Sequence, residues 1–182
     1  MRLVILLAVL LAAPLAAAQS YGVAPQVIGR RLSDGGEARA SMDVRAPPEA
    51  VWAVLADCPN AQRYMPNLLS CRVIERGDGW EIREHRVRGW LLRPVMRNIA
   101  RIELEPNRRF VFRRVAGDWT RSDGEWRLTP IDGGRGTHVE YQVSAALDGP
   151  LPDALSQSAL LNTVRQTLVA LRREAERQPA AS

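Results

Sequence analysis

The chain has 182 residues, of which 46 % are hydrophobic, and its formal net charge is +5. This length and hydrophobic content suit one domain with a single core. All 25 basic residues are arginine, and because they are spread along the chain rather than clustered, the sequence predicts no nucleic-acid partner. After the first twenty residues no segment is apolar enough to span a bilayer, so we expect no transmembrane helix there.

The first 18 residues have the pattern of a secretory signal peptide. Arg2 precedes a short apolar run, and the run leads to three alanines at 16–18. A positive start, a short apolar centre and small residues at the end predict cleavage after Ala18. We therefore expect a mature chain that begins at Gln19 and is periplasmic or secreted. The alternative is an uncleaved signal anchor.

A hairpin follows a small and polar linker at residues 19–25. Strands are predicted at 26–31 and 37–44, with a turn signal, Ser-Asp-Gly-Gly, at 33–36. In the second strand Ala38, Ala40, Met42 and Val44 alternate with polar residues. That period of two indicates a sheet with one buried face and one wet face.

Two short helices are predicted next. Pro47 and Pro48 suit the first turn of a helix. Its apolar stripe includes Val51, Val54 and Leu55. Pro59 is expected to stop this helix, and Asn60 is expected to cap the second one, which Pro66 limits to little more than one turn.

The rest of the chain is rich in strand patterns and closes with a long amphipathic helix. Gly117-Asp118 and Asp123-Gly124 are expected to bracket a short connection. The helix is expected to open at Pro152 and Asp153 and to run to about Arg177. The predicted strands are residues 70–76, 80–88, 96–105, 109–115, 125–129 and 137–146.

This order of elements predicts an α+β fold. A curved antiparallel sheet of about six to eight strands wraps around the long C-terminal helix, and the two short helices follow the first full strand. We expect four segments: the signal peptide at 1–18, a linker and hairpin strand at 19–36, the main domain at 37–177 and a disordered tail at 178–182.

The two cysteines lie on either side of the second short helix. Cys58 is at the end of the first helix, and Cys71 is near the start of the following strand. In an oxidising compartment an even number of cysteines favours pairing, so a Cys58–Cys71 disulfide is predicted. Two buried free thiols are the alternative.

Three segments resemble one superfamily: VRAPPEAVWAVLADCPNAQRYMPNL, SCRVIER and GEWRLTPIDGGRGTHVEYQV. They are similar to the START-like (SRPBCC) superfamily, in its polyketide cyclase/dehydrase and coenzyme Q-binding branch, grouped with Bet v 1-like proteins. The resemblance covers residues 37–177, although Cys58 stands where an aromatic residue commonly follows the Asp57 position. It implies a helix-grip fold whose cavity holds an apolar or amphipathic ligand. Members bind lipids, quinones, sterols or polyketides, and some are cyclases.

No motif marks a catalytic or metal centre, and we expect no catalytic residue, metal or cofactor. His138 is expected to point away from the buried face, and His85, in a charged strand, is interpreted as a solvated or rim histidine. If the protein were a cyclase, the ionisable groups available to point into a cavity would be Glu84, Arg86, Arg113 and Glu140. Arginine–glutamate pairs across strands are commoner as surface ladders.

We expect aromatic and apolar residues from several elements to line the cavity: Tyr64, Met65, Trp90, Met96, Phe112, Trp126, Tyr141, Leu161, Val164 and Leu168. The segment 89–94 adds exposed apolar groups beside an arginine, which suit transient contact with a membrane surface. The predicted function is non-catalytic binding or transport of a hydrophobic small molecule (lipid, quinone or isoprenoid) in the periplasm. The alternatives are a cyclase- or aromatase-like enzyme acting on a polyketide-like substrate, and an envelope interaction protein with a filled core.

Overall fold

The computed structural model describes residues 21–90, 93–147 and 153–178. The predicted signal peptide lies outside these residues, as does nearly all of the predicted tail. The elements in chain order are β1 (Gln26–Leu32), β2 (Gly35–Val44), α1 (Pro48–Ala56), η1 (Cys58–Arg63), β3 (Leu68–Gly77), β4 (Trp80–Trp90), β5 (Arg93–Glu105), β6 (Arg109–Gly117), β7 (Trp119–Ile131), η2 (Asp132–Gly134), β8 (Gly136–Leu147) and α2 (Asp153–Ala175).

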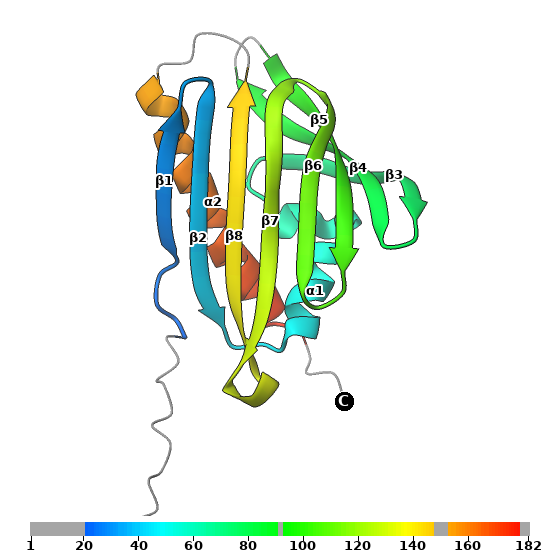
Figure 1. The fold of residues 1–182 in the computed structure, drawn as a ribbon, viewed down its shortest axis with the longest axis vertical. Helices are drawn as coiled ribbons and strands as arrows, with labels where there is room; N and C mark the ends of the chain where they lie inside the picture. The colour runs from blue at the N-terminus through cyan, green and yellow to red at the C-terminus, as the bar shows by residue number, and fades with distance from the viewer. Residues whose placement is uncertain (1–20, 91–92, 148–152, 179–182) are drawn as a thin grey trace, which may run out of the picture.

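The strands form one eight-stranded sheet in the order β1-β2-β8-β7-β6-β5-β4-β3. Every neighbouring pair is antiparallel. The sheet curves around α2, which crosses one face behind β1, β2 and β8 in Figure 1. This arrangement confirms the predicted α+β helix-grip fold. We call the face that α2 covers the inner face and the opposite one the outer face.

Helix α2 is held by the apolar stripe that the sequence predicts. Val164, Leu168 and Leu171 are almost completely buried. The helix also approaches β1 closely, because a Cβ atom at Gly29 would lie only 2.4 Å from Cδ2 of Leu161. Strand β1 therefore takes part in holding the helix. Among the described residues, no helix is long and apolar enough to cross a bilayer.

The two short helices are present, but the second is capped differently from the prediction. Helix α1 begins at Pro48 and buries Val51, Val54 and Leu55. Asp57, rather than Asn60, caps η1, since the backbone N–H of Asn60 donates to Oδ1 of Asp57 at 3.3 Å. The reason is that η1 begins one residue before Pro59, which can occupy a first turn without losing a needed N–H.

Strand β7 is much longer than the predicted 125–129. The expected connection at 119–124 is strand instead, because β8 offers a pairing partner along its whole length: Asp123 pairs with Ser144, and Gly124 pairs with Val143. Gly124 is a packing requirement rather than a turn signal. A Cβ atom there would lie 2.4 Å from the Phe112 ring.

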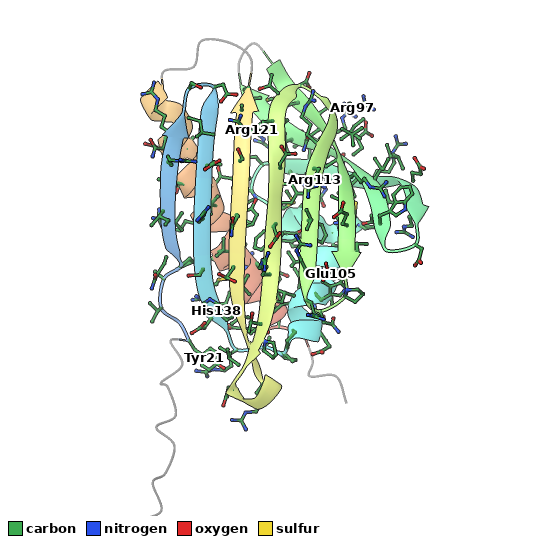
Figure 2. The ribbon with its side chains drawn as sticks, in the orientation of Figure 1. Tyr21, Arg97, Glu105, Arg113, Arg121 and His138 are labelled. Atoms are coloured by element: carbon green, nitrogen blue, oxygen red, sulfur yellow. A yellow bond between two sulfur atoms is a disulfide. The ribbon has the colours of Figure 1, made fainter. Side chains whose placement is uncertain are left out.

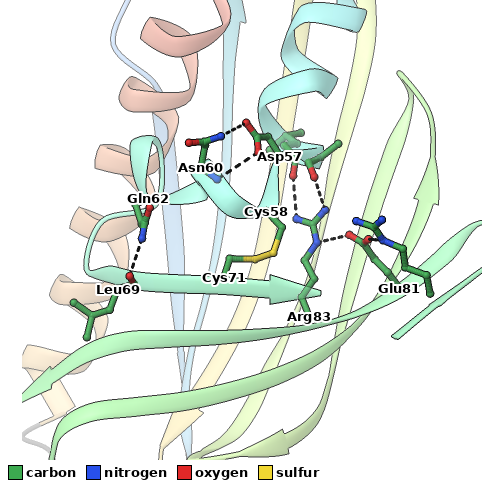
Figure 3. Close-up of a disulfide and its surroundings, with 11 residues drawn as sticks. Asp57, Cys58, Asn60, Gln62, Leu69, Cys71, Glu81 and Arg83 are labelled. Atoms are coloured by element: carbon green, nitrogen blue, oxygen red, sulfur yellow. Dashed lines mark hydrogen bonds and ion pairs between the residues drawn. A yellow bond between two sulfur atoms is a disulfide. The ribbon is translucent and has the colours of Figure 1, made fainter. Parts of the chain in front are cut away.

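The predicted disulfide is confirmed. Cys58, at the start of η1, is bonded to Cys71 on β3, and their Cα atoms are 5.3 Å apart. Figure 3 shows this bridge beside the end of α1. Gln62 adds a second tie, since its side chain donates to the Leu69 carbonyl at 2.7 Å. The helical segment is therefore fastened to an edge strand of the sheet.

Removing the bridge should destabilise the fold. A closed loop with a sequence separation of 13 residues implies about 3 kcal/mol of stabilisation through the restricted unfolded chain. We expect urea unfolding of the wild type to lose about this much in dithiothreitol. The Cys58→Ala/Cys71→Ala variant should start from the lower value and ignore the reductant. A wild-type midpoint unchanged by reduction would contradict this.

Candidate ligand-binding site

The inner face of the sheet can be followed from strand to strand through the register. On β2 its residues are Ala38, Ala40, Met42 and Val44, all buried. Cross-strand partners lie on the same face, so it continues through the rest of the sheet. Its members there are Val139, Tyr141 and Val143 on β8, Ser122, Gly124, Trp126 and Leu128 on β7, Phe110 and Phe112 on β6, Met96, Asn98, Ala100 and Ile102 on β5, and Glu81, Arg83, His85 and Val87 on β4.

The inner face is tightly filled at the end where α1 packs. There Val44, Leu55 and Val139 have no measurable exposure. Toward the end where α2 begins, several inward positions carry small residues, including Ala38, Gly124 and Ser122. Six apolar residues that pack against the core remain only half-buried: Met65, Val87, Phe112, Tyr141, Val143 and Leu161. Apolar groups that face inward yet stay accessible indicate space for an apolar ligand.

An aromatic cluster lies in the middle of this face. Trp126 and Tyr141 are stacked, with ring centroids 3.8 Å apart, and Phe112 lies 6.3 Å from Tyr141. Burial raises the pKa of Tyr64 to about 12 and raises that of Tyr141 as well. Both hydroxyls are therefore neutral at any physiological pH. Within the described residues neither hydroxyl has a hydrogen-bond partner, so each offers a polar contact inside an apolar site.

Arg83 is buried beneath the short helices and has a structural role. It is 2 % exposed. Its guanidinium donates to the carbonyls of Leu55 at 3.1 Å and Ala56 at 2.9 Å, at the end of α1 where carbonyls lack helical partners. It also forms an ion pair with buried Glu81 and lies over the Phe110 ring, 5.1 Å from its centroid. Figure 3 shows the hydrogen bonds and the ion pair of Arg83. The charge is thus fully engaged by the protein.

His85 and Asn98 are direct cross-strand partners on the inner face. Nδ2 of Asn98 donates to Oγ of Ser122 at 3.0 Å. Nε2 of His85 and Oδ1 of Asn98 are both buried and have no partner among the described residues. Burial and the nearby Arg83 guanidinium lower the pKa of His85 from 6.5 to about 4. His85 as a whole is half-buried, and because its Nε2 is shielded from solvent, the interpretation of His85 as a solvated histidine is wrong.

The four ionisable residues considered for a cavity lie instead on the outer face. Glu84, Arg86, Arg113 and Glu140 alternate with the inward positions of their strands. Glu84 forms ion pairs with Arg72 and Arg97, which lower its pKa. His138 also faces outward, as predicted, with its Nδ1 2.7 Å from Oδ1 of Asp43. Figure 2 shows this outer face, with Arg113 and His138 labelled.

Most of the predicted lining residues lie on or against the inner face. Met96, Trp126, Val164 and Leu168 are buried, whereas Met65, Phe112, Tyr141 and Leu161 are half-buried. Tyr64 ends η1 and is 4 % exposed. Trp90 is the last residue of β4, but its side chain lies outside the described part of the structure. The segment proposed for membrane contact, 89–94, likewise falls partly outside it.

The polar residues of this site are the ones that the sequence interpretation missed. One alternating set in β4 consists of Glu81, Arg83, His85 and Val87. Only Val87 in this set is apolar, so it is the one residue whose type indicates that the set faces inward. Ser122 is not predicted to face inward because Gly117-Asp118 and Asp123-Gly124, on either side of it, have the residue types of a connection. In the part of the chain that the structure describes, no three His, Cys, Asp or Glu side chains are placed to hold a metal ion.

This grip of a curved sheet on one long helix, over a partly filled apolar face, is that of a START-like, hydrophobic-ligand-binding domain. The profile of the family described as "Polyketide cyclase / dehydrase and lipid transport" matches residues 44–172, and the chain belongs to that family. Among curated proteins there is no match.

Solved structures agree on the fold. A STAR-related lipid transfer protein from Xanthomonas axonopodis is 20 % identical with a TM-score of 0.69, over 88 % of this chain and 97 % of that one. The lipid transfer and protein localization domain of human StarD13 is 13 % identical with a TM-score of 0.70, over 89 % of this chain and 88 % of that one. The Zhui aromatase/cyclase from Streptomyces sp. R1128 is 20 % identical with a TM-score of 0.61, over 84 % of this chain and 94 % of that one. At such identities the likeness establishes the fold alone.

Replacing Arg83 should test its structural role. Arg83→Leu leaves Glu81 buried with one exposed partner, Arg76, and deprives the α1 carbonyls of their donors. We expect urea unfolding to show a loss of about 3 to 5 kcal/mol. The matched control is Arg72→Leu, whose side chain is 72 % exposed in its pair with Glu84 and which should cost about 1 kcal/mol or less. Similar losses in the two variants would contradict the assignment.

The buried His85 ring should make stability depend on pH. In the folded chain it resists protonation until about pH 4, whereas in the unfolded chain it binds a proton near pH 6.5. The unfolded state therefore binds more protons between these values, and stability falls as the pH falls through this window. Relative to His85→Phe, the wild type should lose about 3 kcal/mol of unfolding free energy between pH 7 and pH 4. Parallel urea-unfolding profiles of the two proteins would count against a buried neutral ring.

Proposed function

We propose that this protein binds a lipid, a quinone or an isoprenoid and carries it through the periplasm without changing it. The observation that carries the proposal is the half-buried apolar surface on the inner face. Phe112, Tyr141 and Val143 face α2 yet keep accessible area. Leaving such surface accessible in an otherwise close-packed protein costs free energy that an apolar ligand would recover.

The inward ionisable groups favour a carrier over an enzyme. Arg83 and Glu81 neutralise each other, and the remaining hydrogen bonds of Arg83 go to α1. His85 is a weak base because its pKa lies near 4, and no carboxylate among the described residues bonds to it. General acid–base catalysis needs a group with a pKa near the working pH and a partner that orients it. The described inner face offers neither.

The periplasmic location rests on two separate signs. Residues 1–18 have the signal-peptide pattern, and the Cys58–Cys71 bridge is of the kind that persists in oxidising compartments. Segment 89–94, at the end of β4, would touch the membrane surface while a ligand is exchanged.

A cyclase is the second candidate, and one observation favours it. His85 and Asn98 bring hydrogen-bonding groups to the inner face, where they would contact a polyketide-like substrate. The third candidate, an envelope interaction protein, requires a filled interior, which the half-buried inward residues argue against. Ligand analysis separates the three, because a carrier releases its ligand unchanged, a cyclase releases a product, and a filled protein releases nothing.

The direct test is native mass spectrometry of protein purified from the periplasm of its own host. We expect a bound apolar molecule that solvent extraction removes, on a polypeptide whose mass lacks residues 1–18. Val143→Trp should reduce binding of the neutral probe N-phenyl-1-naphthylamine about tenfold by filling inner space, followed as probe fluorescence.

The matched control for this variant is Val115→Trp, because Val115 is 52 % exposed and should tolerate the ring. Should Val143→Trp fail to fold, as judged by circular dichroism, Val87→Trp from the opposite side of the inner face replaces it. Wild-type protein that carries no apolar molecule and does not bind the probe would refute the carrier proposal.

A further inference from the structure

Building on the proposed carrier function, we infer that His85 and Asn98 form a binding subsite for a neutral hydroxyl group at one end of the ligand. The two residues are paired across β4 and β5 and face the same side. Nε2 of His85 and Oδ1 of Asn98 are shielded from solvent and lack partners in the described structure. Buried polar atoms without a hydrogen bond are rare in native proteins. Two of them on directly opposed residues indicate a missing partner.

The described polar residues that neighbour the pair on β4 and β7 are engaged elsewhere. Arg83, two residues before His85 on the same strand, is bonded to Leu55, Ala56 and Glu81. Ser122 already accepts from the amide of Asn98. If the Asn98 amide is flipped, its Oδ1 faces Ser122 and accepts a hydrogen bond from the Ser122 hydroxyl. The Nδ2 group then takes the unpaired position. The pair therefore stays incomplete in either amide orientation.

Neither His85 nor Asn98 offers a charge to an anionic head group. His85 is neutral at physiological pH, since its pKa lies near 4, and the charge of Arg83 is balanced by Glu81. Arg114, on the inward register of β6, directs its terminal nitrogen to the Gly117 carbonyl. A phosphate or carboxylate placed between His85 and Asn98 would be desolvated with no positive charge on either residue.

A hydroxyl fits what the two residues leave open. It donates one hydrogen bond and accepts others, so it can donate to Oδ1 of Asn98 and accept from Nε2–H of His85. A carbonyl only accepts, and cannot satisfy Oδ1. The neighbours of the pair on the inner face are Val87 and Met96, which suit the apolar body. The ligand class is thus an alcohol or phenol on a hydrophobic frame.

The test uses four probes that share one body and differ in the end group: farnesol, farnesal, farnesene and farnesyl phosphate. Each competes with N-phenyl-1-naphthylamine for wild-type protein and for His85→Phe and Asn98→Leu. We expect farnesol to bind more tightly than farnesal or farnesyl phosphate. The ratio of farnesol to farnesene affinity should fall about tenfold in each variant, because hydrogen bonds to the hydroxyl are lost. Affinity for the neutral dye should stay within about twofold.

The matched control is His138→Phe, the same substitution on the outer face, which should leave all four affinities unchanged.

Unfolding in urea gives the second readout. An apolar replacement of an unsatisfied group should not destabilise the chain, so His85→Phe is expected to be at least as stable as the wild type at pH 7. Wild type that binds the dye but prefers the aldehyde or the phosphate overturns the hydroxyl subsite and leaves the carrier function standing. A ratio of farnesol to farnesene affinity that neither variant alters also overturns the hydroxyl subsite and leaves the carrier function standing. Absence of dye binding overturns both.

Discussion

The attachment of the short helices to the far edge of the sheet is the constraint on which the inner face depends. Arg83 holds the last carbonyls of α1, and two residues after Ala56 the Cys58–Cys71 bridge holds η1 to β3. A buried guanidinium keeps its place only if its donors are all engaged, and here they meet two carbonyls and Glu81. Fixed at this point, the helical segment cannot sink further into the sheet, so the inner face stays filled near α1 and accessible beyond it.

The polar groups of the inner face fall into two kinds with opposite consequences. The Arg83–Glu81 pair is complete, and it joins two elements. The His85–Asn98 pair is incomplete, and a core optimised for stability alone would replace it with apolar residues. Sites where a chain departs from the rules of good packing are where function is expected. The same strand, β4, thus supplies a structural ion pair at Arg83 and, two residues later, the group left for a ligand.

The sequence was sufficient for the fold because its signals are local. Alternation in β2, the prolines around α1 and the stripe of α2 each specify an element, and their order leaves few ways to bury the apolar faces. It was insufficient for β7 and for the polar site because these depend on partners. Gly124 resembles a turn residue until Phe112 is seen to occupy the space of its side chain. His85 resembles a surface residue, since its neighbours Glu84 and Arg86 are charged, until β3 and β5 enclose it.

The separation of charge between the two faces completes the argument for a carrier. The outer face carries arginine–glutamate pairs such as Arg109 with Glu125, at 2.7 Å. Each exposed pair adds little stability, but together they make the outer face of the sheet largely polar. At the end away from α1, strand β4 ends and α2 begins (Figure 1). On β2 and β7 the inward residues toward that end are small, as at Ala38, Ser122 and Gly124, so the half-buried apolar surface lies between the filled end and the start of α2.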